Sequence, residues 1–338
     1  MAKRILVTGV SGFIAKHVAH QLLEKGYDVR GTVRSLNKAA EVKRALDNAG
    51  ADTAHLSFTA ADLTEDEGWE EAAQGCDGVM HIASPFPVSQ PRDRDALVPA
   101  ARDGALRVIR AARNASRIIM TSSMAAILYR PNRPPVVTVG ENDWTDIDWP
   151  PLSAYVVSKT AAERAVWDLA VAGGFKHRLT TVNPGLVLGP PLDEEFGTSL
   201  DLIRMFMIGA YPALPPAAFP VVDVRDVAAV HVNALEAPET GGRRLVAVSE
   251  SMWLKAIAET LCEAFPHRAR KIPTRVLPAW LVRALAVADR NLASVLPDLN
   301  VEPRVDAGYV TELTGVEFRP AREAIVEAGR ALERLKAI

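Results

Sequence analysis

Cysteine is scarce in this sequence, since Cys76 and Cys262 are the only two among 338 residues. A disulfide framework and a cluster of metal-binding thiolates are therefore excluded, because each needs more cysteines. An excess of charge is also missing: 39 Lys and Arg residues face 41 Asp and Glu residues, for a formal net charge of −2. This balance argues against a nucleic-acid-binding protein, which needs a basic excess to displace counterions from phosphates.

Long apolar segments are lacking too. Residues 1–8 carry a basic pair but no apolar run typical of a signal peptide. The uncharged run 205–222 is long enough to span a membrane, but a spanning helix would not carry its prolines at 212, 215, 216 and 220. We therefore expect a soluble, reduced, cytoplasmic protein that does not enter a membrane.

Short β-branched runs alternate with longer amphipathic segments through the first half of the chain. This alternation predicts right-handed βαβ crossovers and a parallel sheet covered by helices on both faces, the doubly wound, Rossmann-type α/β architecture. The predicted strands are 4–8, 29–33, 55–59, 78–82, 117–121, 178–183 and 244–248, and the predicted helices are 13–25, 38–48, 65–73, 94–112, 152–172 and 224–235.

The pattern changes after Asn183. Prolines crowd the segment 184–220, which is too long for a plain loop, and the chain from Trp253 onward is mostly helical. A length of 338 residues, at roughly 150 residues per domain, allows about two units. We predict a dinucleotide-binding domain from residues 1–183 and about 221–248. A smaller, mainly helical substrate lobe would comprise about 184–220 and 249–338.

A glycine-rich turn follows the first predicted strand. Gly9 permits a tight turn, Gly12 lets the backbone approach a pyrophosphate at a helix N-terminus, and Ala15 is small enough for close helix–strand packing. A Gly-xx-Gly-xx-Ala string is weak evidence alone, but in this place it predicts dinucleotide binding. The residues predicted to bind the dinucleotide here are Gly9, Ser11, Gly12, Phe13 and Ile14.

The charge that follows the second strand indicates NADP. An NAD enzyme needs an acidic side chain at the carboxyl end of this strand, but Asp28 precedes the strand and belongs to the opposite edge. Arg34 follows the strand and can bind a 2′-phosphate with its guanidinium, with Lys38 nearby; otherwise it is a solvated loop arginine. Asp62 can accept a hydrogen bond from the adenine amine, or help to cap the next helix together with Thr64.

Tyr155 and Lys159 lie four residues apart in the predicted helix 152–172, so they share one helix face. A fixed positive charge favours phenolate and lowers the tyrosine pKa from about 10. Such a tyrosine can donate a proton to a carbonyl oxygen or accept one from an alcohol. Ser123, just after the strand 117–121, lies at the same edge of the sheet and can bind the same oxygen. Each residue alone has an ordinary explanation, as a surface pair or a turn former, but together they predict a catalytic site.

These segments together resemble the extended short-chain dehydrogenase/reductases. The similarity is greatest to the branch of dihydroflavonol reductases, cinnamoyl-CoA reductases and microbial aldehyde or ketone reductases. The matching segments are 7–15, 31–34, 81–85, 121–123, 155–159, 182–187 and 222–227, with a weaker match at 313–320.

The resemblance implies an NADP-dependent oxidoreductase that reversibly reduces the carbonyl of a hydrophobic aldehyde or ketone. Ser123 would polarise the carbonyl, Tyr155 would be the general acid, and Lys159 would tune Tyr155 and hold the nicotinamide ribose. The resemblance also favours adenine contacts for Asp62 and Leu63. It further implies cofactor contacts for Ala83, Pro184, Leu186 and Val187.

Two departures from the family bear on the substrate. The cinnamoyl-CoA reductases usually carry Asn-Trp-Tyr-Cys-Tyr-Gly-Lys where this chain has Ser-Ala-Tyr-Val-Val-Ser-Lys at 153–159, which argues against a CoA thioester. Plant dihydroflavonol reductases place a polar side chain after the serine, whereas this chain has Met-Ala-Ala-Ile-Leu at 124–128, which suits an apolar substrate. The predicted substrate contacts are Phe86, Ser123 and Tyr155, and Leu186, Met205 and Phe206 either line the same pocket or belong to the core.

Two other functions fit the same scaffold. A nucleotide-sugar epimerase or dehydratase would retain NAD and need basic groups for a diphosphate, and Arg34 and the proline-rich segment 184–220 argue against it. A non-catalytic NADP-binding regulator would show erosion of the Ser/Tyr/Lys set, which is intact. The seven histidines have no paired spacing, so no metal site is expected, and no serine-hydrolase elbow or Walker A loop is present. We expect a monomer or homodimer that acts on a small molecule.

Overall fold

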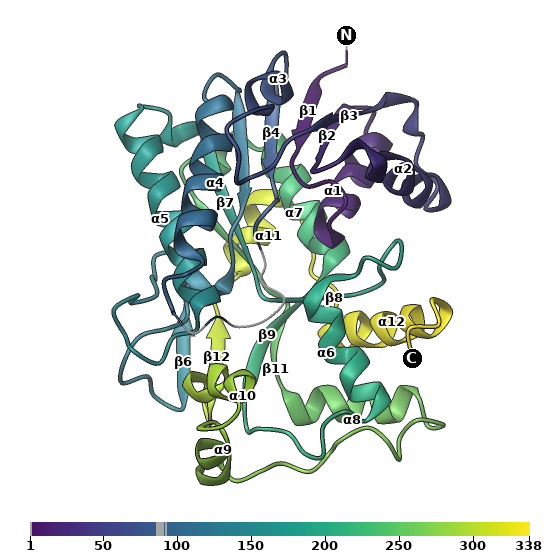
Figure 1. Cartoon of the computed structure of the whole chain (residues 1–338), viewed down its shortest axis with the longest axis vertical. Helices are drawn as coiled ribbons and strands as arrows, with labels where there is room; N and C mark the ends of the chain where they lie inside the picture. The colour runs from purple at the N-terminus through teal and green to yellow at the C-terminus, as the bar shows by residue number, and fades with distance from the viewer. Residues whose placement is uncertain (1, 86–90, 92) are drawn as a thin grey trace.

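The computed structural model describes residues 2–85, 91 and 93–338. Its centre is a seven-stranded parallel sheet of order β10-β7-β5-β4-β1-β2-β3 (Figure 1). The strand order reverses between β1 and β4, so the predicted doubly wound α/β class is confirmed. The strands are β1 (Arg4–Val7), β2 (Asp28–Val33), β3 (Leu56–Ala60), β4 (Gly78–His81), β5 (Arg117–Thr121), β7 (Leu179–Pro184) and β10 (Arg244–Ala247).

Alternate residues of the central strands pack into two cores, one on each face of the sheet. In β1, Ile5 and Val7 belong to one core and Leu6 to the other. Helices from distant parts of the chain cover both faces because each has an apolar stripe to bury (Figure 1). The first face is covered by α1 (Phe13–Glu24) and α7 (Val224–Glu236), and the second by α4 (Val98–Ala111) and α5 (Ala154–Ala172).

The helix starts at 65 and 94 were predicted too early. Asp62 and Asp93 each accept a hydrogen bond from the backbone two residues on, which forms turns ahead of the helices. The structured helices there are α3 (Trp69–Ala73) and α4, while α2 (Ala39–Asn48) matches its prediction closely.

Short strands outside the main sheet were missed. They form a three-stranded sheet of order β11-β9-β8 and a parallel pair, β12-β6. Two of them contain proline, which interrupts the pattern by which strands are recognised. The strands are β6 (Val136–Val139), β8 (Leu186–Leu188), β9 (Ala218–Asp223), β11 (Glu250–Trp253) and β12 (Glu302–Val305).

The remainder of the C-terminal part is helical, as expected. Buried side chains of three helices pack together around Phe206, which is 1% exposed. Of the helices in the described part of the chain, none is long and apolar enough to span a membrane. The division into two domains stays a prediction. The helices are α6 (Gly197–Ile208), α8 (Leu254–Ala264), α9 (Ala279–Leu285), α10 (Arg290–Ser294), α11 (Gly308–Thr314) and α12 (Ala321–Arg334).

Three histidines are buried in the fold. Burial lowers the pKa of His17 and His231 to about 4 and that of His81 to about 3. His231 lies between the Val227 carbonyl oxygen and the Thr121 hydroxyl, each 2.7 Å from one ring nitrogen. The carbonyl can only accept, so Nδ1 carries the proton and Nε2 accepts from the hydroxyl. The ring is therefore neutral and fully partnered.

Acid should destabilise the fold through such histidines. The folded-state pKa of His231 lies below the unfolded value, so its contribution is complete above about pH 6.5 and is lost as the pH falls toward 4. We expect wild type to lose about 2 kcal/mol more unfolding free energy than His231→Gln between pH 7 and pH 5. Urea unfolding at each pH measures this difference. Identical pH dependence in wild type and His231→Gln would contradict the prediction.

Candidate active site

The carboxyl ends of the sheet strands open into a cleft of about 1010 Å³. The cleft includes the switch between β1 and β4, where ligands bind in this architecture. Most of the predicted site residues line it, although they come from loops, helices and strands that lie far apart in the sequence. Those that line it are Gly9, Ser11, Gly12, Phe13, Ile14, Arg34, Asp62, Leu63, Ala83, Ser123, Tyr155, Lys159, Pro184, Leu186 and Val187.

The glycine turn leaves room for a diphosphate. Gly9 has a φ of +62°, and a Cβ there would lie 2.9 Å from the Ala83 Cβ, so glycine is required. Gly12 is the N-cap of α1 and provides no side chain to bond the first-turn amides. The backbone N–H groups of Phe13 and Ile14 therefore remain for an anion at the positive end of the helix. This geometry fits the pyrophosphate of a dinucleotide.

Thr8 fixes the loop after β4 beside this turn. Its Oγ1 accepts hydrogen bonds from the Ile82 and Ala83 amides, both at 3.0 Å. Its own proton is then donated to Nδ1 of His81 at 3.0 Å. His81 is 2% exposed and burial lowers its pKa, so it is a neutral, packed histidine. No local pattern indicates these Thr8 contacts, because the partners lie 73 to 75 residues away.

The end of β2 carries the charges that were expected there. Arg34 is exposed and lines the cleft, whereas Asp28 lies at the start of β2 and bonds His55 at 2.9 Å. Asp62 accepts from both the amide and the hydroxyl of Thr64, at 2.9 and 2.8 Å. These bonds, with a smaller contribution from Arg34, lower the pKa of Asp62. Asp62 thus lines the cleft and forms a turn with Thr64, but it does not cap the next helix, because α3 begins only at Trp69.

Two lysines nearby have partners outside the cleft lining. Lys38, predicted to bind the cofactor, pairs with Glu41 at 2.8 Å and Glu195 at 3.5 Å. Lys16, which no sequence pattern identifies, is 1% exposed, bonds Asp193, and has a pKa lowered by burial. These pairs tie α1 and the segment before α2 to the loop that precedes α6. The cofactor role of Lys38 stays a prediction.

The three catalytic candidates meet at the carboxyl edge of β5. The Tyr155 hydroxyl donates to Ser123 Oγ at 3.5 Å, and Lys159 Nζ lies 5.9 Å from the centre of the Tyr155 ring. The Ser153 hydroxyl caps the first turn of α5, which places Tyr155 and Lys159 on one face of that helix. One substrate oxygen can therefore contact both hydroxyl groups.

The predicted lowering of the Tyr155 pKa is wrong. Burial raises the pKa of the phenol, because phenolate loses its hydration, and the Ser123 bond offsets this only in part. Burial also lowers the pKa of Lys159 to about 8, while Glu163 raises it. The phenol is therefore protonated at neutral pH, as a proton donor must be.

A buried carboxylate behind these residues was also missed. Glu163 is 0% exposed and lies four residues beyond Lys159 on α5. It accepts from Ser122 Oγ at 2.5 Å, Asn183 Nδ2 at 2.8 Å and Arg244 Nε at 2.7 Å. Asn183 also donates to the Ser123 backbone oxygen at 3.1 Å. Glu163 therefore connects the strands that carry Ser123 to the helix that carries Tyr155 and Lys159.

Arg244 is the buried counter-ion of Glu163. Its side chain is 7% exposed and its guanidinium carbon lies 3.8 Å from the centre of the Trp144 ring. Despite burial, the pKa of Glu163 is lowered by Arg244 and by the hydrogen bonds of Ser122 and Asn183. The spacing Lys159–Glu163 could have pointed to the carboxylate, but Arg244 lies 81 residues away and no local pattern identifies it.

The apolar end of the cleft matches the prediction in part. Met124, Ala125 and Leu128 line it, as does Leu186. Phe206 packs in the core instead. Other residues of the predicted set lie elsewhere: Ala126 and Ile127 are fully buried, Met205 is outside the cleft lining, and Phe86 lies outside the described residues. The lining residues that the sequence did not indicate include Tyr129, Phe196, Phe219 and Asp298.

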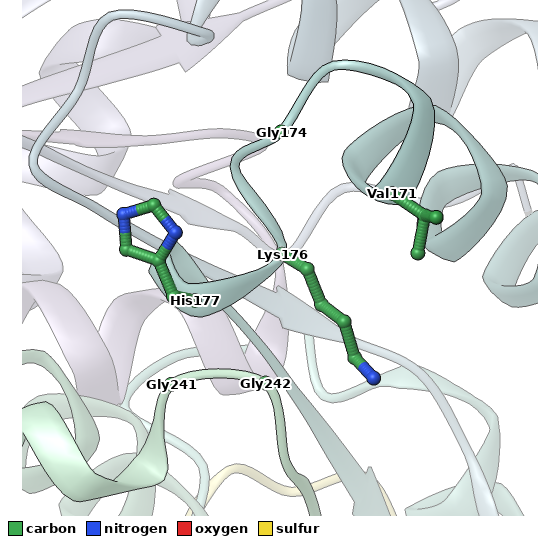
Figure 2. Close-up of a pocket in the computed structure, with 6 residues that line it drawn as sticks. All are labelled: Val171, Gly174, Lys176, His177, Gly241 and Gly242. Carbon is green, nitrogen blue, oxygen red and sulfur yellow. The ribbon is translucent and has the colours of Figure 1, made fainter.

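A second hollow lies at the opposite, amino edge of β7 and β10. Figure 2 shows the side chains of Lys176 and His177 pointing away from each other there, beside Gly241 and Gly242. It therefore offers no group of converging polar side chains. Across the described ranges, moreover, no cluster of His, Cys, Asp or Glu is arranged to hold a metal ion.

Replacing Glu163 with Gln should leave the Arg244 guanidinium buried without its counter-charge. We expect Glu163→Gln to lower the unfolding free energy by about 3–5 kcal/mol, measured by urea unfolding. Glu259→Gln is the control, because Glu259 forms an exposed pair with Lys255 at 3.5 Å. That change should cost at most about 0.5 kcal/mol. Equal losses in the two variants would refute the role of the buried pair.

Known proteins are similar to this chain over most of its length. A model described as the NAD dependent epimerase/dehydratase family matches residues 5–249. Cinnamoyl-CoA reductase 1 of Arabidopsis thaliana is 37% identical over 269 residues, 78% of this chain and 76% of that protein. Ketoreductase azaE of Aspergillus niger is 36% identical over 325 residues, 89% of this chain and 95% of that protein.

A solved structure extends the likeness to the whole fold. Yeast methylglyoxal/isovaleraldehyde reductase Gre2, complexed with NADPH, superimposes with a TM-score of 0.81 at 25% identity, covering 99% of this chain and 100% of that one. Vestitone reductase from alfalfa shares the fold, with a TM-score of 0.77 at 23% identity over 99% of each chain. The chain therefore belongs to the NAD dependent epimerase/dehydratase family of extended short-chain dehydrogenases/reductases, as its sequence resemblance predicted.

Proposed function

We propose that the protein is an NADP-dependent oxidoreductase that reversibly reduces the carbonyl of a hydrophobic aldehyde or ketone to an alcohol. The observation that carries this proposal is the pair of hydroxyls of Ser123 and Tyr155, 3.5 Å apart, with the Lys159 ammonium beside the phenol ring. The pair lies in the same cleft as the glycine turn after β1. A carbonyl oxygen and a dinucleotide can therefore be bound side by side.

The choice of NADP rests on Arg34 and on a structural relative. Arg34 lines the cleft after β2, where a guanidinium can form paired hydrogen bonds with a 2′-phosphate. The acidic residue that would favour NAD, Asp28, occupies the other end of the strand and is bonded to His55. Yeast Gre2, similar over its whole length, was solved with NADPH. The amides of Phe13 and Ile14 would hold the pyrophosphate.

The reaction divides between the cofactor and three side chains. When bound, the reduced nicotinamide supplies a hydride to the carbonyl carbon. Ser123 and Tyr155 each donate a hydrogen bond to the carbonyl oxygen, and Tyr155 then transfers its proton to that oxygen. Lys159 stabilises the phenolate that remains, because its ammonium lies against the ring. In the oxidation of an alcohol the same phenolate accepts the proton.

The alternative functions receive less support. Among the described residues that line the cleft, the cations are Arg34 and Lys159, and Lys159 is assigned to catalysis. A nucleotide-sugar epimerase would need further basic groups for the diphosphate of its substrate. A regulator without catalysis would not need hydroxyls of Ser123 and Tyr155 within hydrogen-bond reach of each other.

Removing the phenol oxygen tests the general acid. We expect Tyr155→Phe to keep its affinity for NADPH, because the ring remains, and to lose at least about 100-fold in kcat. NADPH fluorescence titration measures the binding, and oxidation of NADPH with an aliphatic or aromatic aldehyde measures turnover. Tyr211→Phe, at an exposed ring, is the matched control. Full turnover in Tyr155→Phe would rule out its assignment as the acid.

Removing the guanidinium tests the cofactor choice. We expect Arg34→Ala to weaken NADPH binding about 10- to 100-fold and to leave NADH binding nearly unchanged, because only NADPH carries the 2′-phosphate. Titration of both cofactors measures the two affinities. Lys43→Ala, which removes a charge from the exposed face of α2, controls for net charge. Equal weakening of the two cofactors would show that another group contacts the phosphate.

A further inference from the structure

At the substrate end of the cleft, a pair of polar side chains lies among apolar ones. Tyr129 and Asp298 line the cleft together with Leu128 and Val295. Tyr129 is 8% exposed and Asp298 is 6% exposed, so both are nearly covered by protein and reach the cleft with a small part of their surface. Tyr155 packs against the same apolar cluster that contains Tyr129. This polar group therefore faces the compartment that also holds the catalytic tyrosine.

The Asp298 carboxylate has few partners. Among the described residues it accepts one side-chain hydrogen bond, from the Tyr129 hydroxyl at 3.3 Å, which is long for a bond between oxygens. Arg133 lies 3.8 Å away, beyond hydrogen-bond distance, with a side chain 3% exposed. The Arg133 guanidinium donates instead to the Leu128 and Pro297 carbonyls and stacks over the rings of Tyr129 and Trp149, while its Nε has no hydrogen-bond partner among the described residues. Arg133 thus balances the charge of Asp298 without saturating its oxygens.

The same protein shows what a saturated buried carboxylate is like. Glu163 accepts from several donors, and its pKa is lowered although it is 0% exposed. Burial instead raises the pKa of Asp298 to about 7, although Arg133 and Tyr129 oppose the shift. A buried acceptor that lacks donors costs free energy, and a ligand that supplies one recovers it. At Asp298, a ligand in the cleft can supply that donor.

We propose that Asp298, held by Tyr129 and Arg133, accepts a hydrogen bond from a hydroxyl group of the substrate. The inference rests on the proposed function, in which Ser123 and Tyr155 bind the carbonyl oxygen. The substrate class is then a hydrophobic aldehyde or ketone that carries a hydroxyl at the end remote from its carbonyl. A neutral hydroxyl fits better than an ammonium group, because the buried Arg133 charge repels a second cation.

Matched substrates test this recognition. Hydroxyphenyl ketones and the corresponding phenyl ketones differ by one hydroxyl, as 4-(4-hydroxyphenyl)butan-2-one differs from 4-phenylbutan-2-one. A series with successive spacer lengths, and an aliphatic series of hydroxyketones, covers different separations of hydroxyl and carbonyl. With NADPH, we expect wild type to prefer the best hydroxylated member by about tenfold or more in kcat/KM over its deoxy partner.

Asp298→Asn keeps the size of the side chain and removes its charge, and Asp298→Leu removes the acceptor altogether. We expect the preference to fall severalfold in the first variant and to about 1 in the second, because a hydrogen bond to a charged group is worth more than one to a neutral group. The preference is a ratio within one enzyme sample, so it does not depend on the folded fraction. Glu302→Gln, four residues farther on and outside the cleft lining, should keep the wild-type preference.

The outcomes separate the two proposals. A wild type that reduces both members of every pair equally well would overturn the role of Asp298 and leave the carbonyl reductase assignment standing. An undiminished preference in Asp298→Leu would do the same, since Asp298 would then serve only as the counter-ion of Arg133. No NADPH oxidation with any member of the series would overturn both proposals.

Discussion

The fully buried Glu163 carboxylate forms the contacts on which the geometry of the candidate active site depends. Its donors come from the residue after β5, from β7 and from β10, and Glu163 itself lies on α5. A buried charge is tolerated only when donors surround it, so these four elements are held in one relative position. Ser123 follows directly after the donor Ser122, and Lys159 precedes Glu163 by one helical turn. The geometry of the candidate site is thus maintained by a residue that does not line the cleft.

The contrast between Glu163 and Asp298 separates two uses of a buried carboxylate. Both are almost inaccessible, yet the pKa of Glu163 is lowered and that of Asp298 is raised. The difference follows from the number of donors, because each hydrogen bond to the charged form offsets part of the lost hydration. A saturated carboxylate acts as a structural connector. An under-saturated one at the wall of a cleft is available to bind a ligand, which is the usual physical condition of a recognition group.

Local sequence patterns were sufficient to predict the part of the molecule that contains the main sheet and the glycine turn. All seven strands of the main sheet were predicted within about two residues of their ends, because strand and helix periodicities differ and each turn carries its own signal. The positions of Gly9, Arg34, Ser123 and Tyr155 followed, since the carboxyl ends of parallel strands meet at one edge of the sheet. What periodicity could not give was the sign of the Tyr155 pKa shift, which depends on how much of the phenol is buried.

The part of the cleft proposed to bind the substrate could not be predicted in the same way, and the β12–β6 pair shows why. β6 follows the turn after Ser123, and β12 comes from the C-terminal part, yet they pair in parallel from Val136 with Glu302 to Val139 with Val305. This pairing brings Asp298, just before β12, beside Tyr129, just before β6, across 169 residues of sequence. Both strands are four residues long and β12 contains a proline, so neither can be recognised from the sequence pattern. Because the proposed recognition group depends on such a non-local contact, no local sequence pattern could have identified it.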